Sequence, residues 1–161
     1  MKTLGIIPAR YASTRFPGKP LADLNGKSLI QRVYERVAAA PALDEVMVAT
    51  DDQRIYDHVL SFGGKVQMTS AEHQSGTDRC AEIARNFPDF EVVLNVQGDE
   101  PFIEILALDQ ISRMLQDPEV KIASLMTPVK EVIELDNPNI VKVVVNKFMD
   151  AMYFSRATIP H

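Results

Sequence analysis

Cysteine is nearly absent from this sequence, and long apolar runs are missing altogether. The single cysteine, Cys80, excludes an intrachain disulfide framework and fits a reducing compartment. No run of about 18 apolar residues occurs, so no membrane span is expected. The apolar stretch from Leu4 to Ile7 is too short for the core of a signal peptide. We therefore expect a cytoplasmic protein with no membrane partner.

An excess of positive charge is missing as well. The net charge is -5, whereas nucleic-acid-binding proteins usually carry a basic patch and a high pI, so nucleic acid is not an expected partner. Two phosphate-binding motifs are also lacking, the G-x-x-x-x-G-K-[ST] of a P-loop and the G-x-G-x-x-G of a dinucleotide site. These absences disfavour a P-loop NTPase and a Rossmann oxidoreductase that binds NAD.

The apolar residues follow patterns typical of an α/β domain. With 161 residues, 46% of them hydrophobic, the chain is long enough for a single domain, residues 1–161, with a sizeable core. Short apolar runs indicate buried strands, and spacings of three and four indicate amphipathic helices. The expected strands are 3–8, 45–49, 65–68, 90–96, 121–129, 140–145 and 151–154, the last two forming a hairpin. Helices are expected after Ser28, from a capping box of Thr50 and Gln53, from Ser75 or Thr77, over 103–115 and briefly over 131–135.

The first expected strand runs into a loop that is rich in small residues and carries three cations. The stretch from Gly5 to Leu21 places Arg10, Arg15 and Lys19 at the carboxyl end of an α/β strand, where ligands usually bind. Small residues let backbone N–H groups approach an anion closely, while arginine offers a forked donor and lysine a point charge. We therefore expect this loop to hold a polyphosphate rather than to form a plain solvated turn.

An amide and two carboxylates follow directly after a strongly apolar strand. Gln97, Asp99 and Glu100 follow the strand expected over 90–96, around a glycine that lets the backbone turn. Hard oxygen ligands suit Mg²⁺, which typically takes one or two carboxylates together with substrate phosphates. The alternative is a polar turn that leads into the next helix. In combination with the cationic loop, the pattern favours a Mg²⁺ site.

Three further features allow both a structural and a functional interpretation. Asp51 and Asp52 follow the second expected strand, where acidic residues suit the first turn of a helix and where they would also reach a ligand hydroxyl. His73 is interpreted as a loop histidine rather than a metal ligand. Cys80 is expected in the core, although a place one turn into a helix and beside Arg79 would favour a lower thiol pKa.

The order of these motifs resembles a known family. The segments 7–10 (IPAR) and 19–21 (KPL) are similar to the signature of nucleotide-sugar pyrophosphorylases. In detail the chain resembles the cytidylyltransferases that activate 3-deoxy-D-manno-octulosonate (KDO), the CMP-KDO synthetases. That resemblance rests on 49–52 (ATDD), 73–79 (HQSGTDR), 95–101 (NVQGDEP), 136–144 (DNPNIVKVV) and the closing 153–160 (YFSRATIP).

The resemblance implies a fold, an activity and a cofactor. The fold would be Rossmann-like α/β, a three-layer α/β/α of the nucleotide-diphospho-sugar transferase type with a mixed, mainly parallel sheet. The activity would be transfer of CMP from CTP to the anomeric hydroxyl of KDO, with Mg²⁺, giving CMP-KDO and pyrophosphate for lipopolysaccharide biosynthesis. A homodimer is implied for the full-length form. Activation of another sugar acid, such as a sialic acid, and a non-catalytic CTP-binding domain are the alternatives.

The resemblance also assigns roles to individual residues. Arg10, Arg15 and Lys19 would hold the triphosphate of CTP, with the backbone of Ala9 and Ser13 nearby and Pro8 also binding substrate. His73, Ser75 and Gly76 would lie near the cytosine and ribose. Asp99 would bind Mg²⁺ and would be catalytic together with Arg10 and Lys19. Gln97 and Arg156 would reach the sugar acid, with Arg156 facing its carboxylate. Members of the family continue well beyond Pro160, with a second metal-binding aspartate, so the resemblance implies truncation at the C-terminus.

Overall fold

The computed structural model describes residues 1–12 and 16–160. The chain divides into two compact units, Met1–Ala123 and Ser124–His161, which are described separately below. The single domain expected for residues 1–161 stays a prediction. In the described part of the chain, none of the helices has the length and apolarity needed to span a bilayer.

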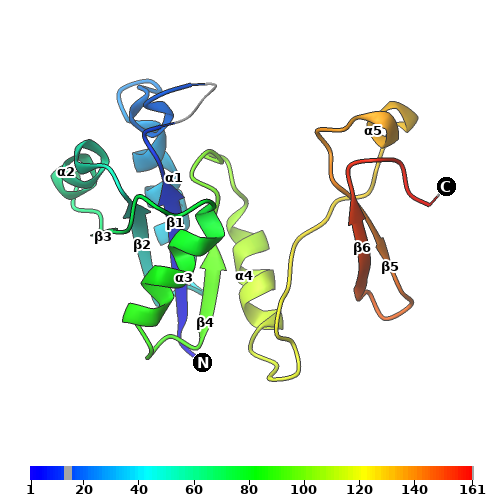
Figure 1. Ribbon diagram of the computed structural model, residues 1–161. Coiled ribbons are helices and arrows are strands. Elements are labelled where there is room, and N and C mark those ends of the chain that lie inside the picture. Colours follow the sequence, from blue (N-terminus) through cyan, green and yellow to red (C-terminus); the bar gives the residue numbers. More distant parts are fainter. Residues whose placement is uncertain (13–15, 161) are drawn as a thin grey trace. The chain divides into compact units, whose positions relative to one another are not determined.

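The first unit is built on a four-stranded sheet in which every pairing is parallel. Its strands are β1 (Thr3–Ala9), β2 (Glu45–Thr50), β3 (Val66–Met68) and β4 (Val92–Asn95). Their order is β3-β2-β1-β4, so β1 lies between β2 and β4 in the middle of the sheet (Figure 1). A parallel central strand is covered on both faces, which is why β1 is a continuous apolar run with nearly every residue buried.

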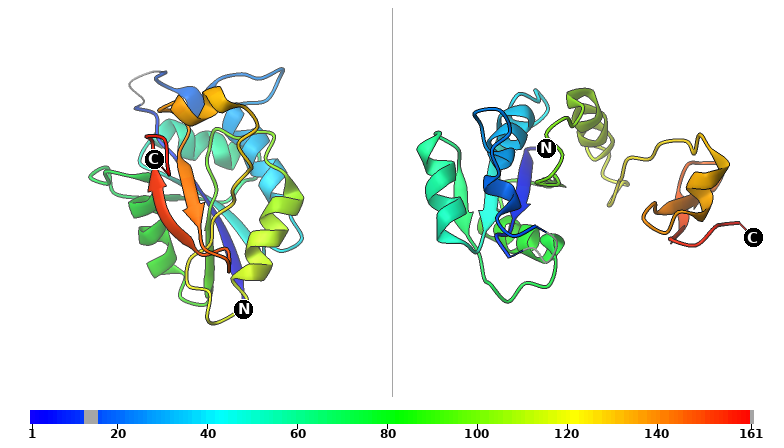
Figure 2. Two further views of the ribbon diagram at one scale, coloured as in Figure 1. Left: turned by 90° about the vertical axis from the view of Figure 1, so that its right-hand side faces the viewer. Right: turned by 90° about the horizontal axis from the view of Figure 1, so that it is seen from above.

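Helices cover both faces of this sheet (Figure 2). They are η1 (Lys19–Leu21), α1 (Leu29–Ala38), α2 (Gln53–Ser61), α3 (Gly76–Asn86) and α4 (Ile105–Met114). Val33, Val59 and Leu108 bring α1, α2 and α4 into one core cluster. Cys80 and Ile83 of α3 pack in a second cluster with Leu4 and Ile6 of β1. The predicted α/β/α layering is therefore confirmed for this unit, and its sheet is wholly parallel where a mixed, mainly parallel sheet was expected.

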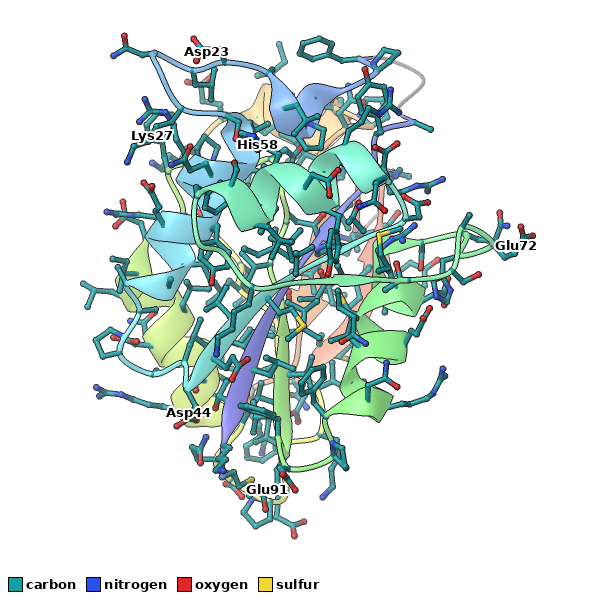
Figure 3. All side chains as sticks on the ribbon, turned by 90° about the vertical axis from the view of Figure 1, so that its left-hand side faces the viewer. Asp23, Lys27, Asp44, His58, Glu72 and Glu91 are labelled. Atoms are coloured by element: carbon teal, nitrogen blue, oxygen red, sulfur yellow. The ribbon has the colours of Figure 1, made fainter. Side chains whose placement is uncertain are left out.

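Polar side chains lie at both ends of the sheet (Figure 3). At the amino end, the Asp44 carboxylate accepts a hydrogen bond from the Thr3 N–H at 2.7 Å. Asp23, Lys27 and His58 lie at the opposite, carboxyl end, where His58 Nε2 is 2.7 Å from Ser28 Oγ. The loops that follow β1 and β4 emerge at this carboxyl end, which is where a parallel sheet normally presents its ligand site.

Helix caps account for where the helices begin. Ser28 accepts a hydrogen bond from the Gln31 N–H and caps α1, as predicted. The capping box expected from Thr50 and Gln53 is wrong, because Thr50 belongs to β2 and is fully buried. Asp52 caps α2 instead, accepting from the Arg54 N–H at 3.0 Å.

The second unit contains α5 (Val132–Asp136) and a hairpin of β5 (Lys142–Val145) and β6 (Ala151–Ser155). The two strands pair antiparallel, which confirms the predicted hairpin. The strand predicted over 121–129 is wrong, since residues 121–130 have no regular secondary structure. A strand needs a neighbouring strand for its backbone hydrogen bonds, and Ile122 in this run is 90% exposed.

Candidate functional site

A hollow of about 230 Å³ opens at the carboxyl end of the sheet of the first unit. It is lined by Pro8, Ala9, Arg10, Lys19, Pro20, Leu29, Gly76, Gln97, Gly98 and Asp99. These residues come from the end of β1 and the residue after it, from η1, from the starts of α1 and α3, and from the turn after β4. The structure thus brings together most of the site residues that the sequence predicts for this unit, and it adds Pro20, Leu29 and Gly98, which sequence reasoning missed.

Two glycines allow three segments to meet around Pro8. A Cβ at Gly98 would lie 3.0 Å from the Pro8 carbonyl oxygen, and a Cβ at Gly76 would lie 3.1 Å from Pro8 Cγ. Any side chain at Gly98 would therefore push the 97–99 turn away from β1, because a backbone oxygen in the central strand has no room to move. The close approach explains why glycine follows Gln97, and it draws Asp99 toward the cationic loop.

Lys19 and Asp99 form an ion pair within this hollow. Lys19 Nζ lies 2.7 Å from Asp99 Oδ2, although the two residues are 80 positions apart in the sequence. Both side chains are about half exposed, at 40% and 53%. The predicted phosphate-binding cation and the predicted metal-binding carboxylate are therefore direct neighbours of opposite charge. Arg10 adds an exposed cation to the lining of the hollow.

The start of α3 is fixed by a complete capping box. Ser75 Oγ accepts from the Asp78 N–H at 3.1 Å, and Asp78 Oδ2 accepts from the Ser75 N–H at 3.1 Å and from the Ser75 hydroxyl at 2.7 Å. The prediction that Ser75 or Thr77 caps this helix is confirmed for Ser75. The Ser75 side chain is engaged within the helix terminus, so Gly76 is the residue of this pair that lines the hollow.

The donor set fits Mg²⁺ only in the company of phosphate groups. The described residues contain no cluster of three or more His, Cys, Asp or Glu side chains that would hold a metal ion by itself. Asp99 offers one carboxylate, with Gln97 beside it in the same lining. Mg²⁺ is often held by one or two carboxylates together with substrate phosphates, so a single aspartate beside a phosphate-binding cation matches that arrangement.

A family model for cytidylyltransferases matches residues 4–161. The chain belongs to this cytidylyltransferase family. A 3-deoxy-manno-octulosonate cytidylyltransferase from Bacteroides thetaiotaomicron is 56% identical over 164 residues, and that alignment covers 99% of this chain and 65% of the relative. One from Geobacter metallireducens is 49% identical, with 100% of this chain and 63% of the relative covered. The chain thus spans less than two thirds of the length of these curated relatives.

Solved structures agree with the family assignment. The structure of CMP:2-keto-3-deoxy-manno-octonic acid synthetase complexed with CTP superimposes with a TM-score of 0.91 at 41% identity, covering 100% of this chain and 66% of that one. A 4-diphosphocytidyl-2C-methyl-D-erythritol synthase from Anaerococcus prevotii gives a TM-score of 0.55 at 14% identity and shares the fold alone. The CMP-KDO synthetase resemblance seen in the motifs is therefore confirmed.

Four of the remaining predicted residues either do not line this hollow or fall outside the described residues. His73 is hydrogen-bonded to the Glu82 carboxylate, and this contact is the main cause that lowers the pKa of Glu82. In the second unit, Arg156 Nη1 donates to the Pro138 carbonyl at 2.9 Å. Ser13 and Arg15 fall outside the described residues. The ligand roles of all four stay predictions.

The two aspartates after β2 have structural partners. Asp51 Oδ2 accepts from Nη2 of Arg79 at 2.8 Å, and Arg79 is a completely buried arginine that sequence reasoning missed. Its Nη1 also bonds Thr69 Oγ1, while its Nε is buried without a hydrogen-bond partner among the described residues. The Asp52 carboxylate caps α2 and also accepts a hydrogen bond from Arg54 Nε. Asp51 therefore braces the start of α3 against the end of β2.

The environment of Cys80 confirms its predicted place in the core and contradicts the alternative of a lowered thiol pKa. Burial raises the pKa of the Cys80 thiol to about 12, although the neighbouring Arg79 acts in the opposite direction. The prediction of a lowered pKa was based on the position near a helix start and beside an arginine. It is wrong because Cys80 is 3% exposed in the core cluster between α3 and the sheet, where desolvation of a thiolate outweighs the attraction of one cation.

Proposed function

We propose that this chain is the nucleotide-binding part of a 3-deoxy-manno-octulosonate cytidylyltransferase. The reaction is attack of the anomeric hydroxyl of KDO on the α-phosphorus of CTP, which forms CMP-KDO and releases pyrophosphate for lipopolysaccharide biosynthesis. The observation that carries the proposal is the hollow in which Lys19 and Asp99 meet beside the end of β1. The relatives of this chain, one of them complexed with CTP, support the choice of nucleotide and sugar acid.

Lys19 and Arg10 act on the phosphates in this proposal. The Lys19–Asp99 pair is exposed, and such pairs contribute about 1 kcal/mol or less. An incoming triphosphate offers more charge than one carboxylate, so Lys19 exchanges Asp99 for phosphate oxygens at little cost. The two cations then stabilise the charge that develops on the departing pyrophosphate. This transfer depends on positioning and charge neutralisation more than on covalent chemistry.

The same exchange frees the Asp99 carboxylate. With Lys19 on phosphate, Asp99 is the residue that would hold Mg²⁺, together with phosphate oxygens of the nucleotide. When bound, Mg²⁺ neutralises phosphate oxygens and lowers the pKa of a coordinated hydroxyl. Gln97, which shares the hollow, and Arg156, which pairs with a carbonyl in the hairpin unit, are the proposed contacts for the sugar acid. The full-length form is proposed to be a homodimer.

Calorimetric titration of the 161-residue chain with CTP, UTP and ATP, each with and without Mg²⁺, tests the nucleotide half. The expected result is a preference for CTP that Mg²⁺ strengthens. A pyrophosphate-release assay on a chain extended to the length of its relatives then tests the transfer, with KDO and a sialic acid compared as acceptors. Binding of CTP without pyrophosphate release from either acceptor would instead support a non-catalytic CTP-binding domain.

A further inference from the structure

The ring of Tyr11 is held between a cation and a glycine. The Arg54 guanidinium carbon lies 3.2 Å from the centroid of the Tyr11 ring, which is a close cation–π contact. Gly18 also packs against this ring, since a Cβ at Gly18 would lie 3.1 Å from Tyr11 Cε2, Cζ and Oη. The same two residues are joined through the backbone, because the Gly18 N–H donates to the Tyr11 carbonyl at 2.9 Å.

Arg54 is itself held in a fixed orientation. Its Nε donates to Asp52 Oδ1 at 2.9 Å, and its Nη2 donates to Asp52 Oδ2 at 2.6 Å. Asp52 is the N-cap of α2, and Oδ1 also accepts the backbone N–H of Arg54. A bidentate pair fixes the plane of the guanidinium as well as its position. The flat face that lies over Tyr11 is therefore anchored to the first turn of α2, a rigid element of the fold.

The position of Gly18, which packs against the Tyr11 ring, in turn determines where Lys19 begins η1. Gly18 has a φ of 72°, a backbone conformation that residues with a side chain rarely adopt, and it is the N-cap of η1. Its carbonyl accepts from the Leu21 N–H at 2.9 Å, so its position sets where η1 begins. Lys19 is the first residue of η1 and carries the ammonium that reaches Asp99 in the hollow.

We infer that Arg54 is a positioning residue for the triphosphate end of the nucleotide site, acting through Tyr11 and Gly18 on the direction of Lys19. The inference rests on the proposed function. Asp52 and Arg54 hold the ring from α2, the ring supports Gly18, and Gly18 starts the segment from which Lys19 points into the hollow. Because Lys19 is proposed to meet the outer phosphates, loss of this support weakens CTP more than CMP.

Calorimetric affinities of the 161-residue chain for CTP and CMP test the inference. Arg54→Met is expected to weaken CTP about tenfold while CMP changes less than about threefold. Arg32→Met is the matched control, because Arg32 also braces a loop through two bonds, to the Leu24 and Asn25 carbonyls at 2.6 and 2.9 Å. That control is expected to leave the affinities for both nucleotides unchanged. Arg54→Lys, which keeps the cation but loses the bidentate bond, is expected to lie between Arg54→Met and the unmodified chain.

Variants of Tyr11 separate positioning from the plain loss of a positive charge. Tyr11→Leu removes the ring without changing the charge and is expected to reproduce the CTP-specific loss, whereas Tyr11→Phe keeps the ring and the affinity. Unchanged CTP affinity in Arg54→Met, or an equal loss of CTP and CMP, would overturn the inference while leaving the proposed function intact. Absence of CTP binding by the unmodified chain would overturn both.

Discussion

Cys80 gives a pH-dependent prediction at the scale of a single residue. Burial raises the pKa of its thiol to about 12, whereas an exposed cysteine has a pKa of about 8.5. The folded state therefore favours the protonated thiol, and this contribution to the free energy of unfolding is present below about pH 8.5 and is lost as the pH rises toward 12. We expect iodoacetamide at pH 8 to label Cys80 about a hundredfold more slowly in the folded protein than in urea.

Mass spectrometry of time points measures this rate, and the urea-unfolded chain is its control. Equal labelling in both states would contradict the buried environment of Cys80.

Burial of the Cys80 side chain was predictable, because an apolar cysteine on the inner side of an amphipathic helix packs in the core. The direction of the pKa shift was not, since it depends on how completely the surrounding core cluster excludes water.

The burial of Arg79 was not predictable from the sequence. An arginine in the first turns of a helix is normally solvated, yet Arg79 is completely buried because Asp51 and Thr69 offer oxygens from two other segments. These partners are distant in sequence and meet only after β2, β3 and α3 have packed. A buried ion pair of this kind therefore becomes visible only with the tertiary structure.

At the scale of one element, the cap of α3 carries the next prediction. Ser75→Ala removes the hydroxyl that accepts the Asp78 N–H and is expected to lower the free energy of unfolding by about 1 kcal/mol. Thr77→Ala is the matched control, because Thr77 is the other cap candidate of the sequence but lies inside the helix. Urea denaturation followed by circular dichroism measures both. A larger loss in Thr77→Ala than in Ser75→Ala would contradict the assignment of the cap.

Elements were predictable where local pattern and long-range pairing agree. The helix after Ser28 and the strand that became β1 have apolar residues at the correct spacing, and each found a buried place in the first unit. The run 121–129 also has an apolar pattern, but it has no partner strand in the described part of the chain and is irregular. The spacing of apolar residues in a sequence indicates which residues can be buried. A strand, however, forms only when a second strand satisfies its backbone hydrogen bonds.

At the scale of the whole molecule, the rule that ligands bind at the carboxyl ends of parallel strands made much of the site predictable. Lys19 follows β1 and Asp99 follows β4, and because these strands are neighbours their loops meet. Sequence reasoning does not supply Leu29 or Pro20 in the lining, because neither carries a chemical signal. The place of Arg156 opposite a sugar acid also stays a prediction, since it lies in the hairpin unit and the hollow in the other unit.

This division of the chain leads to a prediction about the first unit alone. Residues 1–123 contain the parallel sheet, both core clusters and every residue that lines the hollow. A fragment of residues 1–123 is therefore expected to fold cooperatively and to bind CTP within about threefold of the affinity of the 161-residue chain. Circular dichroism and calorimetry measure the two properties. A fragment that folds but has lost CTP would show that residues 124–161 contribute directly to the nucleotide site, whereas an unfolded fragment would show that the first unit depends on them for stability.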